Sequence, residues 1–280
     1  MIFNISDNAA GKMQMAIIRK QYMLERSFRK KIRDILNYQH KILANHARSG
    51  ILNIETTIDS LRGYMLKAIS QQYTKVGAVF FPWIQAEFLK NKTNKKAVDS
   101  GGNSRLLAVE AGGAAGGGGM AAEFWRAFHN WTLILATKKV NDINKTTKRL
   151  IREVIQNTVA EGGSYDIIAE NIMQQAKTIN KSRAMRIART EVHAASVHAI
   201  DESVKSTRVK FEKIWTSKID ERTRIDHAIV NGQRRAQTDY FDVGGEKLMM
   251  PGDPRGSAGN IINCRCVVRY VNKELQRYFV

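Results

Sequence analysis

The chain has 280 residues, which is enough for two domains that each have a hydrophobic core. Its formal net charge of +19 favours a polyanionic partner, above all nucleic acid, although a basic protein can also pair with an acidic protein surface or an anionic membrane. The longest apolar run, residues 76–84, is too short to span a bilayer, and residues 1–7 lack the pattern of a signal peptide. The sequence therefore predicts a soluble intracellular protein with no membrane partner.

Residues 8–48 predict one long amphipathic helix, because apolar residues recur there at helical spacing. A basic helix of this kind can bind DNA or the acidic face of a protein partner, and a basic face that only meets solvent is the alternative. The candidate DNA-binding residues between the apolar positions are Arg19, Lys20, Arg26, Arg29, Lys30, Lys31 and Arg33.

A second helix is expected after the first, because Gly50 is suited to end one helix and Asn53 or Thr56 to begin another. The apolar run 76–83 contains Pro82, and proline disfavours helix at the residue before it. We therefore expect a kink or break at this point, buried as a hinge against the rest of the protein.

Residues 91–120 lose the helical periodicity and are rich in glycine. Glycine loses more conformational entropy on ordering than other residues, so this segment predicts a flexible loop or linker. A phosphate-binding loop is excluded, because no Gly-Lys-Ser/Thr follows the glycines.

Residues 121–207 predict a second helical region, in which an aromatic-rich stripe near the start is expected to face the core. Ser164 is a candidate N-cap for a helix over Tyr165–Ala176. A separate helix is expected over Asn180–Ser206, and its alanines indicate close packing against another helix.

The periodicity changes after residue 208, where alternation predicts a strand over residues 209–215 and short strands near 237–241, 247–250 and 266–271. The expected fold class is α+β, with a long, mainly helical N-terminal region followed by a small C-terminal module of short strands and turns. The predicted domains are an N-terminal helical region (1–90), a Gly-rich linker (91–120), a helical region (121–207) and the α+β module (208–280).

Cys264 and Cys266 are separated by one residue, a spacing that does not suit a disulfide between them. As thiolates they could bind one metal ion together with His227, although zinc knuckles usually space their cysteines by two to four residues. The alternative is that both cysteines are small buried residues of the final strand. A fourth metal ligand would have to be Asp220, Asp226 or Asp253.

A histidine with a nearby carboxylate is the minimum for general-base catalysis, and several such pairs occur after residue 190. No spacing among them is diagnostic, and a hydrogen-bond network that folds the module explains them equally well. We therefore assign no catalytic residue.

A series of short motifs occurs between residues 146 and 271. Their residues are Arg189, Thr190, Glu191, Trp215, Asp220, Arg222, Thr223, His227, Asn231, Gly232, Pro251, Asp253, Pro254, Asn263, Cys264 and Cys266. In this order the motifs resemble the phage head-morphogenesis, or minor head protein, family, whose C-terminal domain is called Mu F-like, and we expect their residues to be structural.

The resemblance implies a non-enzymatic component of the virion head, assembled in the host cytoplasm. The implied partners are the portal protein, the major capsid or scaffolding protein, and packaged double-stranded DNA bound without sequence preference. Some members of the family carry a Cys-x-x-Cys pair and a further histidine where this chain has Arg224, His227 and Ile261. Because two potential ligands are missing here, no cofactor is expected. A nuclease or transferase acting on nucleic acid is the alternative function.

Overall fold

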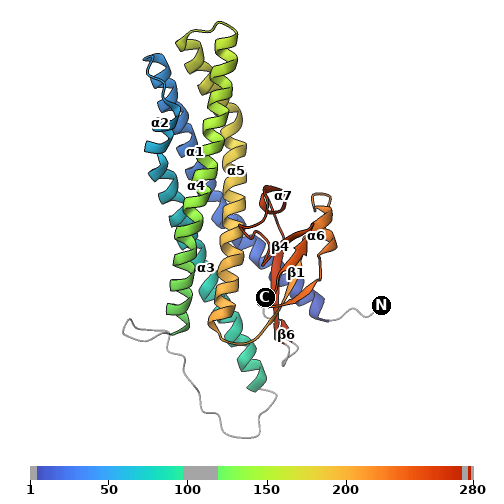
Figure 1. The fold of residues 1–280 in the computed structure, drawn as a ribbon. Helices are drawn as coiled ribbons and strands as arrows, with labels where there is room; N and C mark the ends of the chain where they lie inside the picture. The colour runs from blue at the N-terminus through green and yellow to red at the C-terminus, as the bar shows by residue number, and fades with distance from the viewer. Residues whose placement is uncertain (1–4, 97–118, 273–276, 279–280) are drawn as a thin grey trace.

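The computed structural model describes residues 5–96, 119–272 and 277–278, without the side chains of 5–10, 88–96 and 277–278. An elongated bundle of long helices forms most of the molecule, and a small strand-rich module lies beside one half of it (Figure 1). The helices of the bundle are α1 (Ile5–Arg48), α2 (Ile54–Ser60), α3 (Arg62–Lys96), α4 (Met120–Ala160) and α5 (Tyr165–Ser206).

Helix α5 is the central element of the bundle. It runs antiparallel to α1: the amide of Gln21 donates to Ser196 near one end of the pair (2.5 Å), and the amide of Asn180 donates to Asn37 near the other (3.0 Å). Small side chains along α5 let its neighbours approach closely, as the sequence predicted. Its fully buried alanines are Ala169, Ala184, Ala188, Ala195 and Ala199.

Three predicted helix boundaries are confirmed. Gly50 follows α1 in the left-handed conformation (φ 69°), which glycine adopts without steric cost. The side chain of Asn53 caps α2 by accepting a hydrogen bond from the backbone N–H of Thr56 (3.0 Å). Ser164 caps α5 in the same way, with the N–H of Ile167 as donor.

The break predicted at Pro82 is wrong, because α3 continues through this residue. Pro82 is exposed, and so is Ala78, whose carbonyl loses its hydrogen bond to the missing N–H. Water can satisfy that carbonyl, so the helix tolerates the proline. The predicted burial of this segment is confirmed for Val76 and Phe80, both fully buried.

The two helices predicted over 165–206 are one, since α5 runs without interruption through residues 177–179. No glycine or proline lies at that point, and a single helix buries Ile172 on one side of it and Ala184 on the other. Helix α3 also extends to Lys96, into the predicted linker. The rest of the linker, 97–118, lies outside the described residues, and the domain boundaries stay a prediction.

The C-terminal module contains a four-stranded antiparallel sheet in the order β2-β1-β5-β6 and a separate two-stranded hairpin, β3-β4. The α+β fold class is thereby confirmed. The strand predicted near 237–241 overlaps the structure only at Phe241, where β3 begins, and β2 was not predicted. The elements are β1 (Glu212–Thr216), α6 (Ile225–Ile229), β2 (Arg234–Ala236), β3 (Phe241–Val243), β4 (Glu246–Leu248), α7 (Ala258–Ile261), β5 (Val267–Asn272) and β6 (Arg277–Tyr278).

The sheet packs against α5, so the module and the bundle share one hydrophobic core. Val268 and Tyr270 of β5 belong to the same buried cluster as Val192 and Val204 of α5. The hydroxyl of Tyr270 also donates a hydrogen bond to Asp201 of that helix. A smaller cluster around Trp215 fills the module itself. Among the described residues, no helix is long and apolar enough to span a membrane.

Candidate functional sites: a buried Cys-Cys-His cluster and a basic helix face

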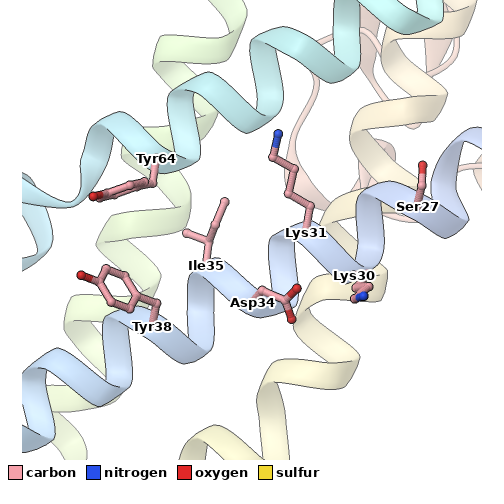
Figure 2. Close-up of a pocket in the computed structure, with 7 residues that line it drawn as sticks. All are labelled: Ser27, Lys30, Lys31, Asp34, Ile35, Tyr38 and Tyr64. Atoms are coloured by element: carbon pink, nitrogen blue, oxygen red, sulfur yellow. The ribbon is translucent and has the colours of Figure 1, made fainter.

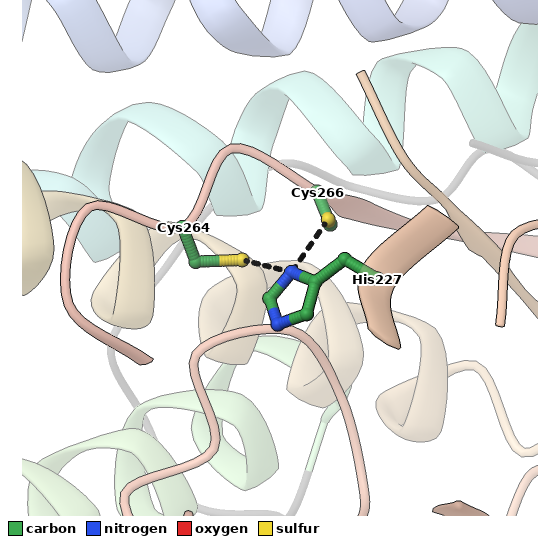
Figure 3. A group of neighbouring side chains, drawn as sticks. All are labelled: His227, Cys264 and Cys266. Carbon is green, nitrogen blue, oxygen red and sulfur yellow. Dashed lines mark hydrogen bonds between the residues drawn. The ribbon is translucent and has the colours of Figure 1, made fainter. Parts of the chain in front are cut away.

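The structure brings together the three residues singled out as metal ligands. His227 lies on α6, and Cys264 and Cys266 lie in the segment before β5; each is at most 3% exposed. The imidazole Nδ1 lies 3.3 Å from Sγ of Cys266 and 3.7 Å from Sγ of Cys264 (Figure 3). Its Nε2 lies 3.3 Å from the side-chain oxygen of Asn260. We call His227, Cys264 and Cys266 the Cys-Cys-His cluster.

The backbone before β5 places both sulfurs on one side. Asn263 has a left-handed conformation (φ 55°), which asparagine tolerates better than most residues, and it turns the chain into the strand. Its N–H donates to the Thr190 hydroxyl on α5 (3.1 Å), which fixes the turn to the bundle. In the extended chain that follows, Cys264 and Cys266 are two residues apart and therefore point to the same side.

The two cysteines shift each other's pKa in opposite directions. The hydrogen bond with Cys266, together with burial, raises the pKa of Cys264. The same hydrogen bond, helped by His227 and Ser217, lowers the pKa of Cys266 against the effect of its burial. The interaction of the two sulfurs therefore favours the thiol form at Cys264 and the thiolate form at Cys266.

The cluster has the spacing of three metal ligands. In a tetrahedral zinc site, sulfur and nitrogen ligands lie about 3.6 Å apart, close to the distances found here. The three ligand atoms lie within 4.8 Å of one another, and among the described residues no carboxylate joins this group. A neighbouring oxygen, the Ser217 hydroxyl, lies 3.4 Å from Sγ of Cys266, but it already donates to the carbonyl of His227. The described residues thus supply three fitting ligands without a fourth.

The Asp-x-x-Thr segment between β1 and α6 is a self-bonded turn. The carboxylate of Asp220 accepts from the N–H of Arg222 (3.0 Å), and the Thr223 hydroxyl accepts from the N–H of Asp220 (2.9 Å). Arg265, which lies between the two cysteines, binds both oxygens of Asp220 at 2.5 Å. This pairing lowers the pKa of the Asp220 carboxyl. The turn is thereby tied to the cysteine segment, whereas the Arg222 side chain is exposed.

The loop that contains Pro251, Asp253 and Pro254 is held by the buried Asp253 carboxylate. This group accepts from the backbone N–H of Met249 (2.7 Å) and pairs with the guanidinium of Arg255 (2.5 Å). Burial would raise the pKa of Asp253, but these hydrogen bonds outweigh burial and lower it.

The same loop lies directly on α5. Gly252 has a φ of 77°, and a Cβ there would lie 2.8 Å from Nδ1 of His193. His193 in turn contacts the carbonyl of Cys266 through Nε2 (2.7 Å). Only glycine therefore fits this position without displacing the histidine that supports the cluster.

The Arg-Thr-Glu segment of α5 links several parts of the fold. Arg189 forms an ion pair with Glu25 of α1 (3.5 Å). Glu191 accepts a hydrogen bond from the hydroxyl of Tyr73 on α3 (2.5 Å). The Glu191 carboxylate also lies 3.8 Å from the ammonium of Lys139 on α4. Burial raises the pKa of Glu191, against the opposing effect of Lys139 and Tyr73. With Thr190 bound to the cysteine segment, three successive residues connect α5 to four other parts of the chain.

The remaining motif residues fix the turn between α6 and β2. Trp215 is fully buried and donates from its indole N–H to Ser217 (3.1 Å). Asn231 accepts from the N–H of Ser217 (2.8 Å), and Gly232, at a φ of 81°, donates its N–H to the Trp215 carbonyl (2.8 Å). Most of the family-motif residues thus make contacts inside the protein.

The candidate DNA-binding residues form an exposed surface on α1. With about 100° of rotation per residue, Arg19, Arg26, Lys30 and Arg33 fall on one face of the helix. Three further basic residues continue this face within an arc of about 80°, and all are exposed. We call this set the basic stripe: Lys12, Arg19, Arg26, Lys30, Arg33, Lys41 and Arg48.

The other three candidates flank the stripe. The ammonium of Lys20 lies 5.1 Å from the ring centre of Trp83, and that of Lys31 donates to the side chain of Gln71 on α3 (2.7 Å). Arg29 is half-buried. The sequence interpretation missed Lys12, Lys41 and Arg48, although the spacing 12, 19, 26 and 33 repeats every seven residues and is itself a signal of one helix face.

A groove of about 480 Å³ opens beside the stripe, between α1 and α3 (Figure 2). Tyr38 and Tyr64 meet edge to face at one end, with ring centres 5.9 Å apart. Lys30 and Lys31 line the other part of the groove. The groove therefore adds aromatic surface next to the positive charges of the stripe.

Comparison with known proteins agrees with the motif analysis. Residues 149–269 match the family model described as Phage Mu protein F like protein. This part of the chain is similar to that family. The match begins in α4 and ends in β5, so it includes the Cys-Cys-His cluster, whereas α1 and the basic stripe lie outside it. The resemblance found in the sequence is thereby confirmed.

One curated relative is the uncharacterized protein YqbB of Bacillus subtilis (strain 168). It is 27% identical over 143 residues, which are 50% of this chain and 47% of that protein. The chain thus spans about half the length of this relative. No solved structure gives a significant match.

Proposed function

We propose that this protein is a minor head protein of a tailed phage that takes part in head assembly. The observation that carries the proposal is the Mu F-like match, together with an arrangement in which most of the motif residues hold the module against α5. The proposed partners are the portal protein and the major capsid or scaffolding protein, in the virion head or its precursor. In this role the module fixes the shape of the molecule, and the bundle presents its surfaces to partners.

We further propose that the basic stripe contacts packaged double-stranded DNA. From Lys12 to Arg48 the stripe extends about 54 Å along α1, at 1.5 Å per residue. Lysine and arginine on such a surface neutralise phosphates and release condensed counterions, which gives affinity without sequence preference. The residues of the stripe are lysine and arginine only, and the exposed Asn37 on the same helix face already accepts a hydrogen bond from Asn180 of α5 (3.0 Å).

Variants in which basic residues of the stripe are replaced by uncharged ones test this contact. Removing residues 1–48 is unsuitable, because Ile32, Leu36 and Leu43 of α1 are fully buried in the core. A variant with Arg19, Arg26, Lys30 and Arg33 all changed to Gln keeps the apolar face intact. Affinity for duplex DNA, titrated at several salt concentrations, should fall, and the slope of log K against log salt should flatten by about 3 to 4, since each phosphate contact contributes about 0.9.

The matched control removes the same number of charges elsewhere. Lys67, Lys75, Arg126 and Lys145 are exposed on α3 and α4, outside the stripe, and their change to Gln should leave most of the slope in place. Equal slopes for the two variants would show that net charge, and not the stripe, binds DNA. In that case α1 becomes a candidate contact for the portal or the capsid.

The alternative, a nuclease or transferase, would need reactive groups that a nucleic acid can reach. His227, Cys264 and Cys266 are each at most 3% exposed, which favours the non-enzymatic proposal. Incubating the pure protein with DNA and RNA, with and without divalent metal ions, tests it. Cleavage that co-purifies with the protein would support the enzyme instead.

A further inference from the structure

The groove between α1 and α3 presents aromatic rings that the core does not use (Figure 2). Tyr38 of α1 is 43% exposed and Tyr64 of α3 is 58% exposed, although their rings meet edge to face. By contrast, Tyr73 and Phe80, further along α3, are fully buried. Each tyrosine of the groove therefore keeps part of its ring open to a ligand.

The other part of the groove is positively charged. Lys30 and Lys31 are exposed, and within the described part of the chain neither ammonium pairs with a carboxylate. Lys31 donates to the side chain of Gln71, which is uncharged (2.7 Å). Asp34 also lines the groove, but its carboxylate lies 3.8 Å from the guanidinium of Arg33, which offsets its charge. The groove therefore has uncompensated positive charge beside its aromatic rings.

The groove is continuous with the basic stripe. At 1.5 Å per residue, its lining residues on α1 extend over about 17 Å from Ser27 to Tyr38, and Lys30 lies about 12 Å from Tyr38 along the helix. At about 100° per residue, Tyr38 is about 60° around the helix from Lys41 of the stripe, on the side that faces α3. A nucleic-acid strand whose phosphates follow the stripe would thus have its bases beside the two rings.

We propose that this groove binds unpaired bases, so that the protein binds single-stranded segments of DNA as well as duplex. Proteins that bind single strands combine a positive groove, which follows the phosphates, with aromatic side chains on which bases stack. A base inside a duplex is covered by its neighbours, whereas a base in a single strand or a frayed end can lie on a tyrosine ring. This inference deepens the proposed DNA contact and rests on it, since Lys30 belongs to both surfaces.

Fluorescence anisotropy with labelled oligonucleotides tests the inference on the full-length protein. The probes are an oligothymidine, a strand of the same length made of abasic units, and a duplex of that length. The abasic strand keeps every phosphate, so its comparison with oligothymidine isolates the contribution of the bases. The unaltered protein should bind oligothymidine about five- to hundredfold more tightly than the abasic strand, which is the gain expected from one stacked base.

Changing Tyr38 and Tyr64 together to Leu removes both rings and keeps apolar side chains at two exposed positions. This double variant should bind oligothymidine and the abasic strand alike, with its affinity for the duplex unchanged. Changing both residues to Phe keeps the rings and should retain the preference. Tyr165→Leu, at a 57% exposed position in the first turn of α5, is the control and should behave like the unaltered protein. Should the double Leu variant fail to fold, Tyr64→Leu alone replaces it and should reduce the preference severalfold.

Three results would overturn the inference. One is an unaltered protein that binds oligothymidine and the abasic strand equally. The second is a folded Leu variant that keeps the preference, and the third is a Phe variant that loses it. If the Leu variant keeps its DNA binding but loses a cross-link to the portal protein, the groove is a protein contact instead.

Failure of the proposed DNA contact has a different signature. In that case the quadruple stripe variant and its matched control show equal salt slopes on duplex DNA. Failure of this inference alone leaves those slopes distinct and removes only the base dependence of single-strand binding.

Discussion

At the scale of single residues, the Cys-Cys-His cluster shows how burial and hydrogen bonding decide the state of two thiols. The interaction between the two cysteines raises the pKa of Cys264 and lowers that of Cys266. Arg224, which donates to the carbonyl of Ile262 (2.6 Å), also favours the charged form of Cys264. The three residues of the cluster are enclosed, and they therefore contribute to the packing of the module.

We predict that the purified protein carries no stoichiometric zinc. His227, Cys264 and Cys266 supply three ligands, but within the described residues the neighbouring Ser217 hydroxyl is engaged elsewhere and no carboxylate reaches the group. Elemental analysis should give well under one zinc per chain. A chelator should leave the melting temperature unchanged, since structural metal binding contributes directly to folding free energy. One equivalent of zinc, lost together with stability on chelation, would contradict this.

The sequence was sufficient to name the members of this cluster but not its surroundings. Two cysteines and a histidine are residue types that bind metals, so they stand out at any spacing. Ser217 and Asn260 are ordinary polar residues whose role depends on tertiary contacts.

At the scale of elements, α5 is the helix on which the others converge. It carries ion pairs to α1 and α4, a hydrogen bond to α3 and the support of the cysteine segment. It also carries His193, which is buried, and His198, whose side chain is 13% exposed; removal from water lowers the pKa values of both, that of His198 to about 3. His198 stacks on Trp131 of α4, with ring centres 4.1 Å apart.

These two histidines predict that the protein loses stability in mild acid. The folded-state pKa of His198 lies below its unfolded value of about 6.5, so the unfolded chain binds the proton first as the pH falls. The contribution of neutral His198 to the free energy of unfolding is complete above pH 6.5 and is lost as the pH falls toward 3. At pH 5 the loss should be about 2 kcal/mol for this residue.

Urea unfolding at pH 7.5 and pH 5 measures this effect. In His198→Gln the difference in unfolding free energy between the two pH values should shrink by about 2 kcal/mol. His129→Gln, at an exposed position of α4, is the matched control and should behave like the unaltered protein. The explanation fails if His198→Gln and His129→Gln lose the same amount of stability.

Helix starts and stops were predictable from local chemistry, whereas helix continuity was not. Asn53 and Ser164 cap their helices as their side chains suggest, and Gly50 ends α1. Pro82 did not end α3, because its exposure leaves the freed carbonyl to water. Tertiary packing, which the local sequence does not show, decided that case.

At the scale of the whole molecule, the bundle and the module form one structure with two kinds of surface. The sheet covers part of α5, and α1 lies along the same helix (Figure 1). The residues of the basic stripe on α1 are exposed. The matched family region covers the module and α5, while the stripe belongs to the remainder. This division fits a positioning role for the module and a charge-based role for α1.

The most direct test of the account is the protein content of DNA-filled heads purified from the phage that encodes this chain. Quantitative mass spectrometry against the major capsid protein should find the chain in every preparation, at a small fraction of the capsid copies, and cross-linking should join it to the portal protein. Empty tails from the same lysate should lack it. A chain that is abundant in the infected cell but absent from purified heads and their precursors would contradict the account.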